Sequence, residues 1–357
     1  MKPISSRSRD ARRSLRELAD TLYHEEGRRA IMPLMGYPGL NLTRSSVKQN
    51  QFNHSVQYQT ISRLYEATRP DALLFLMDLS VEASALGLPV RFPLDNTPTV
   101  EGHEVQSLDD LRKFRHVDIL ADGRVMVYLE VMKHLRAGLP VPVGAYITGP
   151  YTLAGLMSDA TRLAMNVVMD PETAHAVLEF AAQTVTRYAR ALLDSGADFL
   201  MMLDPTAVML GPEQYREFAG SYAREVIGLM DDAEVILHIC GDTGHIVEDM
   251  AATGAAGLSL DSPMDFAQLA RVLGPDTLLI GNVDPVAILR GSEQTVAAAT
   301  GKLLDSMQDV PGFILSTGCD LPQETPMANI QAFMATGRAW QRSAEMAETA
   351  VADGAAC

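Results

Sequence analysis

One imidazole and two thiols stand out in this chain because each follows an apolar run. His238 and Cys240 are two residues apart at the end of the run 234–240, and Cys319 follows the run 312–318, 79 residues after Cys240. Both runs are apolar, rich in β-branched residues and interrupted by glycine, which predicts two buried strands. Residues i and i+2 of a strand face the same side, so the imidazole and the first thiol can reach one metal ion.

Three protein ligands of these types predict a catalytic zinc site. Catalytic zinc usually has three protein ligands and an open fourth position, whereas structural zinc has four ligands. The chain contains only three cysteines and no C-x-x-C pair that would complete a four-ligand shell. Packing is the alternative, because cysteine often behaves as a small buried hydrophobe. The place of these residues in the fold decides between the two.

Length, composition and charge limit the kinds of protein that this chain can be. The chain has 357 residues, of which 47% are apolar, enough for one large α/β barrel or two ordinary domains. It has no apolar stretch of membrane-spanning length, and its first residues lack the apolar core of a signal peptide, so we expect a cytoplasmic protein. A net charge of −16 argues against nucleic acid or an anionic membrane as partner. Three cysteines do not predict a disulfide framework, and Cys357 is the last residue.

The first 28 residues are predicted to form a helical extension before the main domain. Leu15, Leu18 and Leu22 recur at helical spacing. The arginines nearby are interpreted as the solvated face of this amphipathic helix; they are Arg7, Arg9, Arg12, Arg13 and Arg16.

Short apolar runs alternate with longer amphipathic segments along the rest of the chain. The predicted strands are 31–36, 72–78, 143–148, 198–204, 234–240, 257–261, 277–282 and 312–318. Helical patterns between them include 171–196, 213–230, 266–273 and 293–307. Alternation of this kind favours parallel βαβ units, and eight of them close into a (β/α)8 TIM barrel.

A single barrel domain over residues 29–345 is therefore predicted, followed by a C-terminal tail at 346–357. The stretch from Leu79 to Pro142 is too long for one crossover. It is expected to contain an excursion around 91–102 and two helices, near 107–115 and 123–137.

The predicted barrel makes the carboxyl ends of its strands the expected place of the active site. Active-site groups of TIM barrels lie at the carboxyl ends of the strands. Several predicted strands carry polar residues at these ends. This shared location favours metal binding over packing as the role of His238. Asp204 and Asp78 are predicted to have catalytic roles. A structural cap is the alternative for Asp204, and capping or solvent contact at a strand end is the alternative for Asp78. Further residues are predicted to line the site and bind substrate or cofactor: Asn282, Asp242, Asp261 and Tyr37.

Five segments resemble the uroporphyrinogen decarboxylase superfamily and, within it, the methylcobamide:coenzyme M methyltransferases. They are 195–204, 211–218, 238–242, 281–284 and 316–322, and the resemblance extends from the first strand to beyond residue 330. The His-x-Cys pair with its distant cysteine is the specific part, whereas the other segments mark only the superfamily. The decarboxylase branch carries an arginine-containing segment after its first strand, and residues 32–39 of this chain contain no cation there.

The resemblance implies a zinc-dependent methyltransferase. Zinc would be held by His238, Cys240 and Cys319, and the methyl donor would be a methylcobalamin-type corrinoid carried on a partner protein. The acceptor would be a thiol such as coenzyme M. Four alternatives stay open: a uroporphyrinogen-decarboxylase-like lyase, transfer to tetrahydrofolate, loading of the corrinoid from a methylated donor, and a zinc-containing protein that only binds a corrinoid module.

Overall fold

Eight parallel strands form the centre of the molecule. The computed structural model describes residues 12–342. The strands of the main sheet are β1 (Ala30–Ile31), β2 (Leu73–Leu74), β5 (Val143–Thr148), β6 (Phe199–Leu203), β7 (Glu234–Ile239), β8 (Gly257–Leu260), β9 (Leu278–Val283) and β10 (Phe313–Thr317). Their order in the sheet is β1, β10, β9, β8, β7, β6, β5, β2, and all pairs are parallel. The predicted (β/α)8 barrel is confirmed.

The seam of the barrel lies between β1 and β2, where both strands are shorter than predicted. A side chain and a main-chain group of Asp71 bridge it: the Asp71 N–H donates to the Ile31 carbonyl at 2.9 Å, and Asp71 Oδ2 accepts the Ile31 N–H at 2.9 Å. The predicted strand 31–36 ends early because it contains Pro33, which has no N–H for a sheet ladder. The predicted strand 72–78 retains only two residues of ladder, paired with β5.

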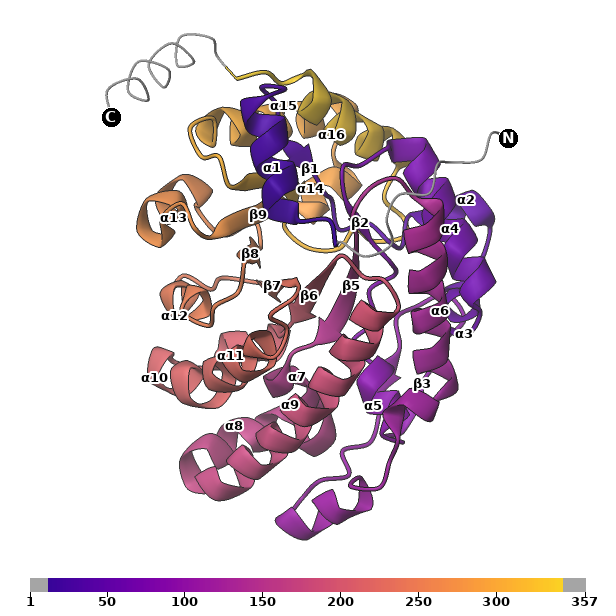
Figure 1. Cartoon of the computed structure of the whole chain (residues 1–357), viewed down its shortest axis with the longest axis vertical. Coiled ribbons are helices and arrows are strands. Elements are labelled where there is room, and N and C mark those ends of the chain that lie inside the picture. Colours follow the sequence, from indigo (N-terminus) through magenta and orange to yellow (C-terminus); the bar gives the residue numbers. More distant parts are fainter. Residues whose placement is uncertain (1–11, 343–357) are drawn as a thin grey trace.

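Helices surround the strands (Figure 1). The first half of the chain contributes α1 (Leu15–His24), α2 (Gly39–Thr43), α3 (Val47–Phe52), α4 (His54–Thr68), α5 (Val81–Ala85), α6 (Gly123–Gly138), α7 (Pro150–Ser158), α8 (Ala160–Met169) and α9 (Pro171–Asp194). The second half contributes α10 (Pro212–Gln214), α11 (Ser221–Gly228), α12 (Val247–Ala251), α13 (Phe266–Leu273), α14 (Pro285–Arg290), α15 (Glu293–Ser306) and α16 (Met327–Ala339). Every residue of β5, β6, β8 and β10 is buried, as expected of parallel strands covered on both faces.

Two predicted helices differ from the structure. Residues 213–230 are not one helix: α10 runs into a π-helix, η4 (Tyr215–Gly220), before α11 begins. The predicted helix near 107–115 is a 3₁₀ helix, η1 (Leu108–Lys113), followed by another at η2 (Ile119–Ala121). The predicted excursion around 91–102 contains a small antiparallel pair, β3 (Val90–Arg91) with β4 (Thr99–Val100).

The N-terminal helix α1 closes the end of the barrel where the strands begin. Glu234, at the start of β7, accepts the main-chain N–H groups of Leu15 and Arg16. Leu15 is fully buried within the same apolar core as the strands. The boundaries predicted for the extension and the barrel domain stay predictions, and the predicted tail at 346–357 lies outside the described residues.

The arginine cluster near the start is not simply a solvated face. Arg12 donates to the carbonyls of Leu193 and Ala197, and Arg16 donates to the Pro275 carbonyl. Arg13 forms an ion pair with Asp198 at 3.1 Å. The interpretation as solvated side chains was wrong for these three residues because they bind carbonyl and carboxylate groups where the helix meets the barrel. Arg7 and Arg9 lie outside the described residues.

Among the described residues, no helix is both long enough and apolar enough to cross a lipid bilayer.

Candidate metal centre

The barrel brings together the three residues that the sequence predicts as metal ligands. His238 lies on β7, Cys240 directly follows that strand, and Cys319 follows β10. Strands β8 and β9 separate β7 from β10, so the two groups approach each other across the mouth of the barrel. One ligand atom from each residue lies within 4.8 Å of the other two, and His238 Nε2 is 3.9 Å from Cys319 Sγ.

These residues fit a zinc ion. With zinc–sulfur bonds of about 2.3 Å and zinc–nitrogen bonds of about 2.0 Å, tetrahedral geometry puts the ligand atoms roughly 3.5–3.8 Å apart. The observed spacing is close to that range, and only a small approach of the side chains would reach it. His238 is 2% exposed while Cys240 and Cys319 are partly exposed, so the centre is open on one side. An open side is what a catalytic zinc site requires.

The imidazole of His238 is oriented by a neighbouring strand. The parallel register of β7 and β8 pairs His238 with Ser259, and His238 Nδ1 lies 3.0 Å from Ser259 Oγ. A hydrogen bond from Nδ1–H to this hydroxyl leaves the lone pair of Nε2 facing the thiols. This is the usual way in which a protein fixes the tautomer of a metal-binding histidine.

The two cysteine thiols strongly affect each other's pKa. The side chain of Cys319, followed by that of His238, lowers the pKa of the Cys240 thiol to about 5. Cys240 in turn raises the pKa of the Cys319 thiol. One thiolate therefore forms readily, whereas a second thiolate beside it requires a positive charge. A bound cation supplies that charge and keeps both sulfurs deprotonated.

Asp261, at the end of β8, connects the loops that carry the two cysteines. Its Oδ2 accepts the N–H of Gly241 at 3.0 Å, directly after Cys240. On the other side, a Cβ placed on Gly318 would lie 2.8 Å from Asp261 Oδ1 and 2.7 Å from the Ser262 nitrogen. The absence of a side chain at Gly318 therefore allows the Cys319 loop to approach. Asp261 therefore positions main chain beside the candidate centre, and its predicted role in substrate or cofactor binding stays a prediction.

Asn282 and Asp242 bind main-chain groups near the centre. The Asn282 amide donates to the carbonyls of Asp261 at 3.1 Å and Met264 at 2.7 Å. Asp242 is exposed, and its Oδ1 accepts the Gly244 N–H at 3.0 Å in a local turn. Asn282 holds the loop after β8, and Asp242 stabilises the turn after Cys240. Their predicted roles in substrate or cofactor binding stay predictions.

Asp204 lies at the N-terminus of helix α7. Its Oδ1 accepts the Thr152 N–H at 2.6 Å, and burial raises the pKa of its carboxyl group to about 6. A Cβ on Gly149 would lie 2.3 Å from the Asp204 side chain, so only glycine allows this approach. These contacts match the capping alternative, because a carboxylate satisfies free N–H groups at a helix start. A catalytic role for Asp204 stays a prediction.

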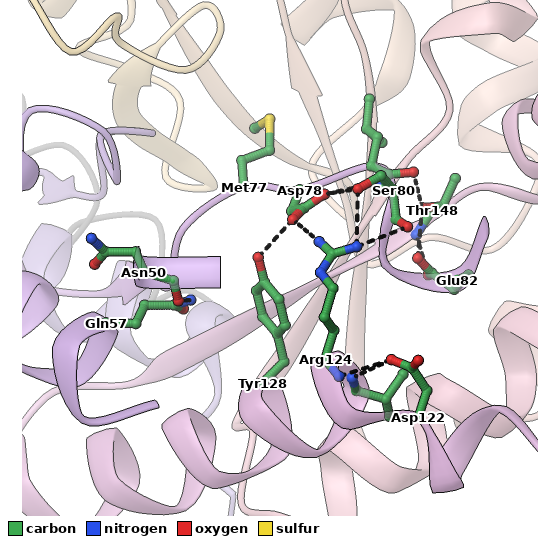
Figure 2. A network of polar contacts seen from close by, with 12 residues as sticks. Asn50, Gln57, Met77, Asp78, Ser80, Glu82, Asp122, Arg124, Tyr128 and Thr148 are labelled. Atoms are coloured by element: carbon green, nitrogen blue, oxygen red, sulfur yellow. Dashed lines mark hydrogen bonds and ion pairs between the residues drawn. The ribbon is translucent and has the colours of Figure 1, made fainter. Parts of the chain in front are cut away.

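Asp78 lies in a buried network after β2 (Figure 2). It forms an ion pair with Arg124 of α6, and Asp78 Oδ2 also accepts the Tyr128 hydroxyl at 2.9 Å. Its Oδ1 accepts the N–H and the hydroxyl of Ser80 at 2.9 and 2.7 Å. The Asp78 side chain is completely buried, and both oxygens are occupied by partners from the chain itself.

Tyr37 is buried beside this region. Its hydroxyl donates to the Met77 carbonyl at 2.9 Å, which fixes the segment after β1 against the segment after β2. Burial raises the pKa of the Tyr37 hydroxyl, and the nearby charge of Asp78 raises it further. Binding of substrate or cofactor by Tyr37 stays a prediction.

Sequence reasoning missed three residues of this region. Residues 32–39 contain no cation, whereas Arg124 of α6 places a buried one in this region. It was missed because it lies far away in the sequence and because a charged residue gives no sign of burial. Ser259 could have been found by assuming a parallel register between the strands that contain it and His238. Asp320 follows Cys319 directly, and its carboxylate oxygens are buried without a hydrogen-bond partner among the described residues. Its place in the segment 316–322 was the available signal.

Comparison with known proteins agrees with this architecture. Residues 42–340 match the family model described as uroporphyrinogen decarboxylase (URO-D). The chain is 33% identical over 269 residues to a methylcobamide:CoM methyltransferase, MtbA, of Methanosarcina acetivorans, covering 73% of this chain and 77% of the relative. It is 31% identical over 269 residues to a uroporphyrinogen decarboxylase of Alcanivorax borkumensis, covering 72% of this chain and 75% of the relative.

A solved structure shares the whole fold. A methyltransferase from Methanosarcina mazei superposes with a TM-score of 0.82 at 23% identity, over 92% of this chain and 99% of the other. The chain belongs to the uroporphyrinogen decarboxylase family. It is an enzyme, and its similarity to the MtbA proteins identifies it as a methyltransferase of that family.

Substitution of Gly318 tests the approach of the Cys319 loop. In Gly318→Ala, the added Cβ collides with Asp261 and Ser262 and displaces Cys319. We expect zinc affinity to fall by about 10- to 100-fold, the usual effect of losing support around a metal ligand. Competition with a chelator measures it. Gly301→Ala is the control, because its Cβ meets nothing within 4 Å. Equal zinc affinity in both variants would contradict this account of the loop.

Substitution of Arg124 tests the buried network. Arg124→Met leaves the Asp78 carboxylate buried without its cation, so unfolding should become easier by about 3–5 kcal/mol. Denaturant-induced unfolding provides the measurement. Arg63→Met removes an exposed ion pair with Glu66 and should cost less than about 1 kcal/mol. If the two variants lose equal stability, the network is not a buried ion pair in solution.

Proposed function

We propose that this enzyme transfers a methyl group from a methyl-Co(III) corrinoid to a thiol, using zinc held by His238, Cys240 and Cys319. The observation that carries the proposal is the convergence of these three ligand atoms within 4.8 Å at an open barrel mouth. Similarity to proteins named methylcobamide:CoM methyltransferase supports the same chemistry. Those names also favour coenzyme M as one candidate acceptor.

The donor set suits activation of a thiol. Zinc in this site would supply an open coordination position and a positive charge that favours the thiolate form of the acceptor. One neutral imidazole and two thiolates balance the charge of a divalent ion, so a further sulfur retains much of its nucleophilicity. Water activation is more usual at sites rich in histidine or carboxylate.

The proposed reaction is a nucleophilic displacement. The acceptor thiol loses its proton to solvent, and the thiolate sulfur attacks the methyl carbon. A sulfur–carbon bond forms while the cobalt–carbon bond breaks, and its electron pair stays on cobalt. The products are a methyl thioether and a Co(I) corrinoid. Because a corrinoid is too large for the packed interior of a barrel, we propose that a corrinoid-binding partner protein presents it at the mouth.

The contacts of Asp78 favour methyl transfer over decarboxylation. The sequence resembles the decarboxylases at this aspartate, but here both of its carboxylate oxygens are occupied by Ser80, Arg124 and Tyr128. A carboxylate that already has these partners is poorly placed to bind a substrate. We place the reaction in the cytoplasm, as expected from the sequence.

Metal analysis combined with a methyl-transfer assay tests the proposal. We expect about one zinc per chain, as a three-ligand catalytic site implies, and zinc-dependent transfer from methylcobalamin to a thiol. Cys319→Ala and His238→Ala should each lose both zinc and transfer, since each removes a ligand. Cys357→Ala is the matched control and should keep both.

Three results would contradict the proposal. Full transfer by Cys319→Ala would exclude the zinc centre, and tetrapyrrole decarboxylation unaffected by a chelator would favour the lyase. A panel of acceptors that includes thiols and tetrahydrofolate identifies the acceptor class, because under this proposal only a thiol should be methylated. Tight binding of methylcobalamin without methylated product would indicate a binding protein.

A further inference from the structure

Two exposed apolar side chains lie beside the candidate metal centre. Met209 ends the 3₁₀ helix η3 (Pro205–Met209), which follows β6, and it is 55% exposed. Val286 lies in the first turn of α14, which follows β9, and it is 52% exposed. Because the parallel strands of a barrel end at one mouth, both residues belong to the face that carries the predicted metal ligands. The fold leaves both side chains uncovered there.

The neighbours of Met209 pack against the loop after β7, which starts at the first cysteine ligand. A Cβ placed on Gly241 would lie 3.9 Å from Val208 Cγ2. On the other side of Met209, His245 Nε2 donates to the Leu210 carbonyl at 3.1 Å. The main chain at Met209 is therefore held beside this loop, while its own side chain extends into solvent.

Val286 has a corresponding place beside the second cysteine ligand. The N–H of Gly318, directly before Cys319, donates to the Val283 carbonyl at 2.8 Å. Asp284 then caps α14, because its Oδ1 accepts the Val286 N–H at 2.8 Å. These contacts fix the first turn of α14 next to the Cys319 loop. Each cysteine loop thus has one exposed apolar side chain next to it.

The mouth of the barrel carries further exposed apolar side chains. Single exposed apolar residues are normal on a protein surface, so their location is what matters. Besides the two described above, segments that follow the carboxyl ends of strands expose Leu42, Leu94, Met165, Val168 and Met169. At the opposite end of the barrel, where the strands begin, Leu229 and Val272 are exposed. Within residues 12–342, the mouth therefore presents more apolar surface than the end that α1 closes.

Exposed carboxylates accompany the apolar side chains next to the centre. Glu213 lies in α10, shortly after η3, and Asp284 precedes α14; both are exposed. The cation nearest to Glu213 in the sequence, Arg216, forms an ion pair with Asp249 at 3.1 Å. Arg290 lies in the last turn of α14, away from its start. The surface around the centre is therefore apolar and acidic, which disfavours an anionic ligand.

We propose that Met209 and Val286 bind the corrin ring of the methyl donor. The inference rests on the proposed function, because it names the residues with which the same site receives its donor. The packed interior of a barrel excludes a corrin, so the methyl group reaches a zinc-bound sulfur only if the ring lies across the mouth. In that position the ring covers the apolar side chains that extend from the mouth, and removal of apolar surface from water favours binding.

The acidic surroundings also suit the charge of this ligand. The methyl-Co(III) corrin core is cationic, and it becomes a neutral Co(I) core when the methyl group leaves and the bonding electron pair stays on cobalt. Carboxylates beside the ring therefore attract the methylated form more strongly than the product. The same surface thus favours replacement of the spent corrinoid by a methylated one.

Serine substitutions test the apolar contacts. The assay uses the full chain loaded with zinc, methylcobalamin as donor, and the thiol that is methylated fastest in the acceptor panel. Met209→Ser and Val286→Ser should each raise KM for methylcobalamin by about three- to tenfold, because each loses the burial of about half an apolar side chain. Zinc content and KM for the thiol should stay unchanged, since neither residue is a metal ligand.

Val272→Ser is the matched control for Val286→Ser. Val272 is 51% exposed, but it lies near the end of α13, at the opposite end of the barrel. The control should leave KM for methylcobalamin unchanged. Met209→Leu keeps an apolar side chain and should retain a KM close to that of the unmodified enzyme. This conservative variant decides the role of the position where Met209→Ser fails to fold.

The outcomes separate this inference from the proposed function. An unchanged KM for methylcobalamin in both serine variants, or an equal rise in Val272→Ser, would overturn ring binding and leave zinc-dependent transfer intact. Loss of zinc or a parallel rise in KM for the thiol would also overturn it, because these changes report a disturbed metal centre. A zinc-loaded enzyme that transfers no methyl group to any thiol would instead refute the proposed function itself.

Discussion

The mutual repulsion of two closely spaced sulfur ligands is the constraint on which the rest of the site depends. One thiolate forms easily at Cys240 because Cys319 and His238 lie beside it, and the same proximity suppresses ionisation of Cys319. Both sulfurs can be anionic only if a cation lies between them. The fold maintains this unfavourable proximity through contacts outside the ligands themselves, with Ser259 orienting the imidazole and Asp261 holding the main chain after Cys240.

The parallel barrel explains how ligands far apart in the sequence meet. Every strand ends at the same mouth, so residues after β7 and β10 converge although two strands separate them. The approach also requires Gly318, because any larger residue would collide with the end of β8. Metal-site geometry in this protein therefore depends on sheet register and on a small residue, as much as on the identity of the three ligands.

The sequence predicted the barrel well where its strands are continuous apolar runs. Strands β5 to β10 were found within one or two residues because they are buried on both faces and lack alternation. The prediction was poorer at the seam, where Pro33 ends a ladder and β2 keeps only two residues. The ligand residues could be identified from residue type and strand position. The burial of Arg124 could not, because long-range packing of α6 against the segment after β2 determines it.

Two buried carboxylates near the strand ends show how similar residues acquire different roles. Asp78 is neutralised by Arg124 and hydrogen-bonded by Ser80 and Tyr128, so its charge is used within the fold and stabilises the segment after β2. Asp320 has burial without such partners. Burial without a counter-charge disfavours the charged form of a carboxyl group, and it raises the pKa of Asp320 to about 7. The difference in partners, rather than the residue type, therefore separates these two carboxylates.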